Sequence, residues 1–191
     1  MKKMKLKSID YLNISDHFSE DEIMVQHTAR DFVTKEVMPS IEEHFEKGTF
    51  PLEMVKKFGD LGFLGMNLPQ EYGCAGMSHI AYGLLCQELE RGDSGIRSFV
   101  SVQGSLVMYP IYAYGSENQR KKWLPKLASG EKIGCFGLTE PNHGSNPGGM
   151  LTNVKKVKGG YILNGAKMWI TNGSISDVAV VWAKDDDGIV R

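Results

Sequence analysis

The spacing of hydrophobic residues changes near Gly130, which divides the chain into a helical part and a β-rich part. In the first part, apolar residues recur every three or four positions, the pattern of amphipathic helices that bury one face. The clearest stripe contains Val25, Ala29, Phe32, Val33, Val37, Ile41 and Phe45. Ser19 and Glu22 form a capping box that predicts where this helix starts, and Pro39 predicts a bend or an end within it.

Four more helices are predicted before Gly130, each from an apolar stripe with a start or stop residue. They cover residues 51–62, residues 78–91, an uncharged stretch that begins at Ser98, and residues 116–127, which start with a second capping box of Ser116 and Gln119. The uncharged stretch, 98–116, approaches the length of a membrane span, but its serines, its glycines and Pro110 favour a buried helix with a turn. Residues 18–130 are therefore expected to form an all-α domain.

After Gly130, short β-rich runs are separated by Gly-Gly and Asn-Gly turn dipeptides. The predicted strands are residues 133–138, 161–164, 168–171 and 177–183. The expected fold class is α+β: an all-α N-terminal domain followed by the first part of an antiparallel β-domain over residues 131–191. A further candidate strand begins close to Arg191, so we expect this sheet to have an unpaired edge.

Composition excludes several classes of protein. The chain has 22 Lys plus Arg against 23 Asp plus Glu, a net charge of -1, so it lacks the positive surface that nucleic acid requires. With 41% hydrophobic and 24% charged residues it is typical of a folded domain rather than a disordered one. Its 3 cysteines form no C-x-x-C pair, so neither a disulfide framework nor a zinc site is predicted.

Common cofactor and targeting motifs are missing from the sequence. It contains no G-x-G-x-x-G, no P-loop and no histidine pair spaced for metal, so no metal site is predicted. Residues 1–17 form a basic tail with Lys2, Lys3, Lys5 and Lys7, which has neither the apolar core of a signal peptide nor the composition of a transit peptide. We expect a cytoplasmic protein, or a mitochondrial-matrix protein if the source is eukaryotic, with no membrane insertion.

Two segments carry residue types that suit a ligand. Residues 135–147, CFGLTEPNHGSNP, read as a strand that runs into a polar loop, where backbone N–H groups and hydroxyls can bind a flat heterocycle and an anion. An ordinary surface loop has the same composition. Residues 167–173, KMWITNG, place Trp169 and Thr171 on one face of a predicted strand. Packing of the Trp in the core is the alternative.

Together the two segments resemble the paired flavin-binding motifs of the acyl-CoA dehydrogenase family, an aromatic-small-x-T-E-P-x-x-G-S-D pattern and a K-x-W-I-T-N pattern. Residues 62–76 and 115–131 also resemble the family, and the resemblance covers the chain from about Phe18 to its end. It implies that the rest of the β-domain, a C-terminal four-helix domain and the catalytic glutamate lie beyond Arg191. No residue of this chain is offered as the catalytic base.

The resemblance implies FAD as cofactor. The residues implied to bind it are Phe136, Gly137, Leu138, Thr139, Glu140, Pro141, Asn142, His143, Gly144, Ser145, Trp169, Ile170 and Thr171. Thr139 would face the pyrimidine side of the flavin, Thr171 would reach N5, and Trp169 would pack on one face of the ring. Ser145 would contact the FAD pyrophosphate or the CoA pantetheine. Asn146 and Asn153 depart from the Asp and Arg that related sequences carry, which could weaken loop order and affinity.

Residues 88–98, with Ser101-Val102-Gln103 after them, resemble the glutaryl-CoA dehydrogenases. The resemblance implies that Arg97 and Ser98 bind the far carboxylate of the substrate, since a buried carboxylate needs a fixed cation and hydrogen bonds. Glu90 would assist proton shuttling in members that decarboxylate. The alternative is that Arg97 is an exposed partner of Asp93 or Glu90, and that Glu90 is a helix-surface charge.

The reaction implied is FAD-dependent α,β-dehydrogenation of an acyl-CoA, with glutaryl-CoA oxidised and decarboxylated to crotonyl-CoA, a step of lysine and tryptophan degradation. A carboxylate base would remove the α-proton while the β-hydride moves to flavin N5. The implied partners are the acyl-CoA, an electron-transfer flavoprotein and, for the complete enzyme, three further copies in a homotetramer. A fragment of a short-chain monocarboxylic acyl-CoA dehydrogenase and a non-catalytic remnant that acts as a binding module are the alternatives. We expect the isolated chain to have little activity and weak FAD binding.

Overall fold

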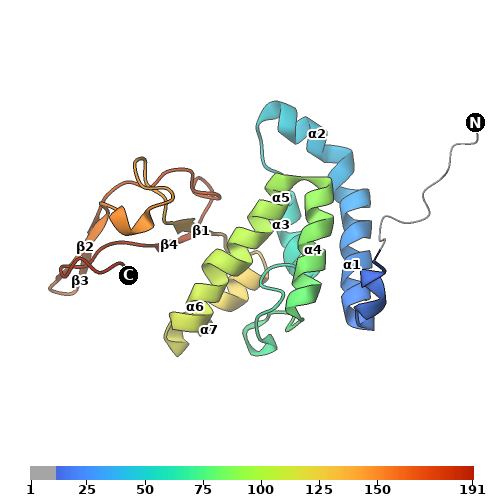
Figure 1. Cartoon of the computed structure of the whole chain (residues 1–191), viewed down its shortest axis with the longest axis horizontal. Helices are drawn as coiled ribbons and strands as arrows, with labels where there is room; N and C mark the ends of the chain where they lie inside the picture. Colours follow the sequence, from blue (N-terminus) through green and yellow to red (C-terminus); the bar gives the residue numbers. More distant parts are fainter. Residues whose placement is uncertain (1–11) are drawn as a thin grey trace, which may run out of the picture.

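The computed structural model describes residues 12–191, with a bundle of helices at one end and short strands at the other (Figure 1). The four lysines of the predicted basic tail lie outside the described residues. The main helices are α1 (Glu20–Phe32), α2 (Met38–Lys47), α3 (Glu53–Asp60), α4 (His79–Gly92), α5 (Ser94–Ser101), α6 (Tyr109–Tyr114) and α7 (Glu117–Ala128). The strands are β1 (Gly134–Gly137), β2 (Asn153–Val157), β3 (Gly160–Asn164) and β4 (Val178–Val181).

The predicted first helix is continuous from α1 to α2. Its capping box is confirmed: the Ser19 side chain accepts from the Glu22 N–H, and the Glu22 side chain accepts from the Ser19 N–H. A π-helical turn, η2 (Val33–Val37), precedes Pro39, which lies in the first turn of α2. The wider turn lets the helix continue past a residue that cannot donate a backbone hydrogen bond. The stripe is buried as far as Val37, and Ile41 is half-buried against the core. The expectation for Phe45 is wrong because it is 83% exposed.

The long uncharged stretch forms one helical run of α5, a second π-helical turn η4 (Val102–Met108), and α6. It begins earlier than predicted, because the Asp93 side chain accepts from the Ile96 N–H and starts α5 at Ser94. The caps of α4 and α7 lie at Ser78 and Ser116 as expected. Within residues 12–191, no helix is both long and apolar enough to cross a membrane.

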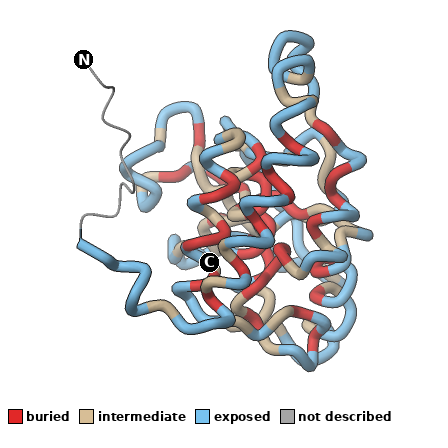
Figure 2. Tube along the Cα trace, turned by 90° about the vertical axis from the view of Figure 1, so that its right-hand side faces the viewer, coloured by how far each residue is buried: buried red, intermediate tan, exposed pale blue. Residues whose placement is uncertain are grey.

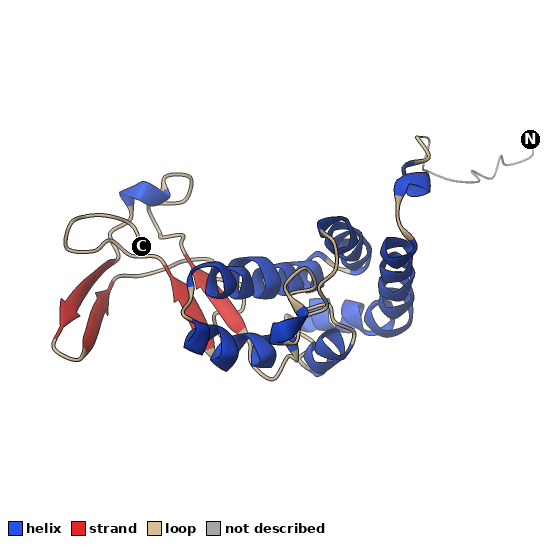
Figure 3. Cartoon of the chain, turned by 90° about the horizontal axis from the view of Figure 1, so that it is seen from below, coloured by secondary structure: helices blue, strands red, loops and turns tan. Residues whose placement is uncertain are grey.

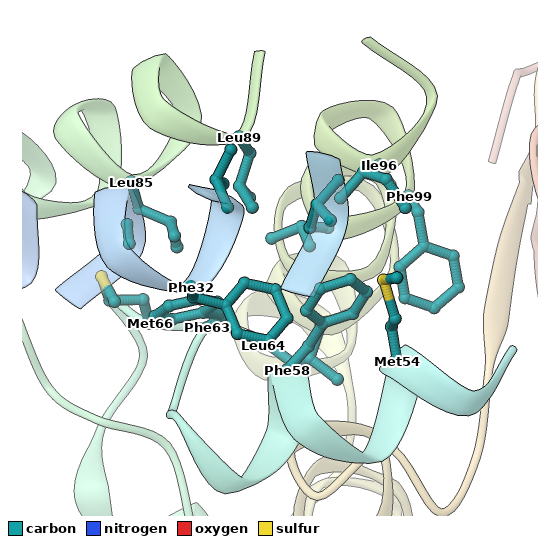
Figure 4. Packing of buried hydrophobic residues seen from close by; sticks show 14 of the residues in the cluster. Phe32, Met54, Phe58, Phe63, Leu64, Met66, Leu85, Leu89, Ile96 and Phe99 are labelled. Atoms are coloured by element: carbon teal, nitrogen blue, oxygen red, sulfur yellow. The ribbon is translucent and has the colours of Figure 1, made fainter. Parts of the chain in front are cut away.

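Aromatic rings from separate helices meet in the core of the helical part. Phe32 contacts Phe58 and Phe63 edge to face, with ring centroids 5.6 and 5.8 Å apart, and Phe58 lies 5.9 Å from Phe99 (Figure 4). Figure 2 shows that buried residues run through the middle of the bundle. Helix α3 also packs closely against the end of α7, since a Cβ on Gly59 would lie 2.3 Å from the Ser129 carbonyl oxygen.

The strands form two separate pairs, which corrects part of the sequence prediction. β2 and β3 are antiparallel, which is the orientation expected for the sheet, and form a hairpin that turns at Lys158 and Gly159. β2 itself was not predicted, because its pattern is largely polar. β1 and β4 are parallel, with Cys135 opposite Ala179. Parallel strands need a long connection, which here carries the hairpin and both ligand-suited segments. The prediction of strand 168–171 is wrong, because Trp169 has a left-handed φ of 60°.

Helices α1 and α4 are joined by a buried carboxylate. The Glu88 side chain is 2% exposed and accepts from Arg30 Nη2 at 2.6 Å and from Arg91 Nε at 3.0 Å. Burial raises the pKa of Glu88, but the hydrogen bonds from Arg30 and Arg91 outweigh it and leave that pKa below its ordinary value. Glu88 is therefore an anion at neutral pH, held between two cations.

We expect Glu88→Ala to lower the free energy of unfolding by about 2 kcal/mol, below the usual cost of breaking a fully buried pair. The cost is reduced because the Arg30 side chain is 50% exposed and stays solvated after the pair is lost. Urea unfolding followed by circular dichroism measures this change. The exposed Glu42→Ala of α2 is the control, and equal stabilities of the two variants would contradict the prediction.

Candidate active site

A cavity of about 230 Å³ lies where the helical part meets β1. β1 packs against η4, and Figure 3 shows the β1–β4 pair lying against the helices, apart from the β2–β3 hairpin. The residues that line the cavity are Val102, Leu106, Phe136, Leu138, Thr139, Trp169, Ile170 and Thr171. The structure thus brings together both ligand-suited segments and a helix that the sequence placed far from them.

The first segment is held by β1 and its neighbours. The Gly134 N–H donates to Gln103 Oε1 at 2.8 Å, and a Cβ on Gly134 would lie 2.4 Å from Val107 Cγ1. The Trp182 N–H donates to the Gly137 carbonyl at 3.0 Å. The strand ends there, so Leu138 and Thr139 turn out of the sheet and line the cavity.

The second segment is a turn that leans on the first. The Met168 N–H donates to the Thr139 carbonyl at 2.9 Å, and Asn172 Nδ2 donates to the Gly134 carbonyl at 3.2 Å. Trp169 is 83% exposed, so the alternative of core packing is wrong for this residue. Trp169 still lines the cavity, together with Thr171. Residues of both segments thus line one cavity, while the backbone structure predicted for the second segment is wrong.

Glu140 and Lys167 form an ion pair beneath these segments. The Lys167 ammonium donates to Glu140 Oε1 and to the Leu138 carbonyl, both at 2.9 Å, and the two side chains are 4% and 12% exposed. Glu140 also accepts from the N–H groups of Leu151 at 2.7 Å and Thr152 at 2.9 Å. Both carboxylate oxygens are thus engaged within the protein, and a direct contact between Glu140 and a cofactor stays a prediction.

The rest of the polar loop lies outside the cavity lining. Pro141, Asn142, Gly144 and Ser145 are exposed, and the turn is closed by paired backbone hydrogen bonds between Glu140 and His143 at 3.2 Å. The ligand roles of residues 141–145 stay predictions. Within residues 12–191, no three His, Cys, Asp or Glu side chains gather where they could hold a metal ion.

Arg97 pairs with Glu90 across the junction of α4 and α5. Arg97 Nε donates to Glu90 Oε2 at 2.5 Å, and Nη1 donates to Ser101 Oγ at 3.1 Å. The hydrogen bond from Arg97 holds the pKa of Glu90 below its ordinary value, and the same bond raises the pKa of Arg97. The pairing with Glu90 is the one that the sequence left open, whereas Asp93 caps α5 instead. Ser101 contacts the guanidinium, and the predicted role of Ser98 in binding the substrate carboxylate stays a prediction.

Arg97 and the cavity belong to the same helical run. Val102 and Leu106, which line the cavity, follow Arg97 along α5 and η4. At 1.5 Å per residue, Val102 lies roughly 7 Å from Arg97 along the axis, a distance that a short acyl chain can span. The guanidinium is reachable, since the Arg97 side chain is 35% exposed.

Comparison with known proteins decides the family. The family model "Acyl-CoA dehydrogenase, N-terminal domain" matches residues 19–131, and "Acyl-CoA dehydrogenase, middle domain" matches residues 135–190. The chain belongs to the acyl-CoA dehydrogenase family. The resemblance seen in the two segments is thereby confirmed, as is the order of a helical domain followed by the start of a β-domain.

Individual acyl-CoA dehydrogenases are similar over most of this chain. A crystal structure of glutaryl-CoA dehydrogenase from Mycobacterium smegmatis in complex with FADH2 is 54% identical, with a TM-score of 0.91, over 94% of this chain and 46% of that one. A glutaryl-CoA dehydrogenase in complex with glutaryl-CoA is 36% identical, with a TM-score of 0.86, over 89% and 44%. Human mitochondrial short-chain specific acyl-CoA dehydrogenase is 40% identical over 85% of this chain and 40% of its own length. The chain thus spans less than half the length of these relatives.

One buried polar side chain near the cavity is a residue for which the sequence predicted no role. Gln103 is fully buried, and its Nε2 donates to the carbonyls of Leu127 at 3.0 Å and Lys132 at 2.9 Å. With the bond from Gly134, this one amide joins η4, the end of α7 and the start of β1. Gln103 therefore fixes β1, the strand that leads into the first ligand-suited segment, against the helices.

Because Glu140 is paired with Lys167 in the folded protein, we expect the free energy of unfolding to change with pH. Burial alone raises the pKa of Glu140, but the N–H groups of Leu151 and Thr152 and the Lys167 ammonium outweigh it and lower the pKa from 4.5 to about 2. A lowered folded-state pKa contributes stability above the unfolded value, and this stability is lost as the pH falls through the folded value. We expect the stability of the wild type to approach that of Glu140→Gln between pH 4.5 and 2. Urea titrations at several pH values test this, and a constant difference would contradict it.

Proposed function

We propose that this chain forms the front part of an FAD-dependent acyl-CoA dehydrogenase that oxidises glutaryl-CoA and decarboxylates it to crotonyl-CoA. The observation that carries the proposal is one cavity. There the two segments that resemble flavin-binding motifs, the flavin-type segments 135–147 and 167–173, meet the helical run that contains Arg97. The 54% identity to the M. smegmatis glutaryl-CoA dehydrogenase supports this substrate over a monocarboxylic one. The 40% identity to the human short-chain enzyme supports butyryl-CoA as the second candidate.

The cavity residues fit a flavin ring. Most of the lining is apolar or aromatic, while Thr139 and Thr171 add hydroxyls, which matches a flat heterocycle with apolar faces and polar edges. We propose that these two threonines hydrogen-bond the ring edges and that the exposed Trp169 covers the open side. Bound FAD supplies the hydride-accepting chemistry. The further cofactor contacts of residues 136–145, including a Ser145 contact with a pyrophosphate or pantetheine, belong to the same proposal.

Arg97 would bind the far carboxylate of the substrate. Its guanidinium carries donors in a planar fork that matches a carboxylate, and it is the cation nearest to the cavity along α5. Ser101 contacts the guanidinium and would orient it, and Ser98 would add a hydroxyl. Glu90, kept anionic by Arg97, would lie beside the carboxylate that is lost and would assist proton movement. For the complete enzyme we propose an electron-transfer flavoprotein as electron acceptor and a homotetramer.

The proposal is tested with a completed chain, in which this chain is joined to the part of the M. smegmatis enzyme that follows the matched region. We expect the completed chain to purify with flavin absorbance and to oxidise glutaryl-CoA with an artificial electron acceptor. A colourless, stable product without turnover would overturn the proposed function.

The 191-residue chain alone is expected to turn over glutaryl-CoA at least about 10²-fold more slowly than the completed chain. The reason is that no carboxylate lines the cavity formed by the described residues, so no general base faces the substrate. We also expect weak FAD binding by this chain alone. The same assay measures both proteins, and equal rates would contradict the prediction.

A further inference from the structure

The two flavin-type segments are joined by few backbone hydrogen bonds. The segment around Trp169 does not form a strand, and the Met168 N–H to Thr139 carbonyl bond at 2.9 Å is its backbone link to the first segment. A turn with a left-handed Trp169 has no ladder to fix its distance from Thr139. Side chains must therefore determine how far apart the two cavity walls lie.

The Glu140–Lys167 pair occupies the position that such a role requires. Glu140 follows Thr139 directly, and Lys167 lies two residues before Trp169, so each member of the pair is close in sequence to a residue of the cavity lining. Neither Glu140 nor Lys167 lines the cavity itself. The ammonium also donates to the carbonyl of Leu138, which does line it.

A third segment is held by the same carboxylate. The Glu140 oxygens accept from the N–H groups of Leu151 and Thr152, just before β2 begins. The pair thus connects the strand-to-loop turn after β1, the Trp169 turn and the entry to the hairpin. Loss of either partner leaves a buried charge without its counter-ion, which moves these segments rather than leaving them in place.

We propose that Glu140 and Lys167 are positioning residues that fix the spacing between Thr139 and Thr171, and with it the width of the flavin cavity. The inference rests on the proposed FAD binding. If the pair had a purely structural role, breaking it would change only the stability of the chain. If the pair positions the cavity walls, breaking it must also change how FAD is held.

The test uses the completed chain, freed of its flavin, with FAD as the probe; binding is followed by quenching of flavin fluorescence and by visible circular dichroism. We expect Lys167→Met to weaken FAD binding about 10- to 100-fold. In metal sites, removing a residue that only orients the metal ligands weakens binding by about the same factor. The visible circular dichroism of the flavin should change shape at saturation. Lys155→Met, an exposed lysine of β2, is the matched control and should bind as the wild type does.

Two further variants separate positioning from stability. Glu140→Gln keeps the shape and an acceptor, so it should lose less affinity than Lys167→Met and keeps the test available if the Met variant does not fold. The double variant combines Glu140→Gln with Lys167→Met, so neither charge is left without its counter-ion. We therefore expect it to bind FAD more tightly than Lys167→Met alone does. Hydrogen exchange of the Met168, Leu151 and Thr152 amides, measured without FAD, should become faster in Lys167→Met.

The outcomes distinguish this inference from the proposed function. If the wild type binds FAD and Lys167→Met binds it with the same affinity and the same visible spectrum, the positioning role is wrong and the proposed function stands. If the completed chain with the wild-type residues shows no saturable FAD binding, the proposed function and this inference fall together. If only the unfolding transition shifts while bound flavin is unchanged, the pair is structural and the inference is wrong.

Discussion

Replacing Arg97 by alanine in the completed chain is expected to lower kcat/KM for glutaryl-CoA by about 10²- to 10⁴-fold, with butyryl-CoA turnover changed by less than about threefold. The magnitude follows from two charge-assisted hydrogen bonds between a guanidinium and a carboxylate, each contributing about 1.5–3 kcal/mol. Butyryl-CoA has no far carboxylate, so it does not use this cation. The steady-state rates with both substrates measure the ratio.

Arg97→Lys is the matched variant for this test. It keeps the positive charge but loses the planar fork that lets Arg97 contact Glu90 and Ser101 together, so an intermediate loss is expected. An equal fall of kcat/KM for glutaryl-CoA and butyryl-CoA would show that Arg97 supports the fold of the α4–α5 junction rather than the choice of substrate. In that case butyryl-CoA becomes the better supported substrate.

Helix-start signals, which are local in the sequence, were read correctly. The capping boxes at Ser19 and Ser116 join residues three positions apart, so their geometry depends on little besides the helix itself. One local contact was missed, because helical i, i+4 spacing places Ser101 beside Arg97 and the sequence analysis gave Ser101 no role. For the two ligand-suited segments, composition left an ordinary loop and core packing open, and the family resemblance pointed to residues that meet at the cavity.

Features that depend on distant partners could not be read from the sequence. The parallel pairing of β1 with β4 requires a crossover whose path is set by packing against η4, and no strand signal records it. The polar pattern of β2 hid a strand whose side chains are mostly exposed. The left-handed Trp169 broke a run of strand-forming residues, because its position is set by the bonds to Thr139 and Gly134 rather than by β-propensity.

Buried polar side chains show the same limit most clearly. Glu140 was predicted to contact the cofactor and Lys167 was given no role, while their mutual pairing depends on the fold. Gln103 lies among small and apolar residues of an uncharged helix, and its three partners come from two other parts of the chain. A buried glutamine in such a helix is itself a signal, because a buried amide requires partners.

Gln103→Leu is expected to lower the free energy of unfolding by about 3–5 kcal/mol, a large share of the 5–15 kcal/mol that stabilises a typical domain. Leucine nearly fills the volume but leaves three groups unpaired: the Gly134 N–H and the carbonyls of Leu127 and Lys132. Each orphaned group costs about 1–3 kcal/mol. Urea unfolding followed by circular dichroism measures the change, with the exposed Gln87→Leu of α4 as control. Because Gln103 holds the start of β1, FAD affinity should fall with stability, and a Gln103→Leu variant as stable as the control would show that these groups find other partners.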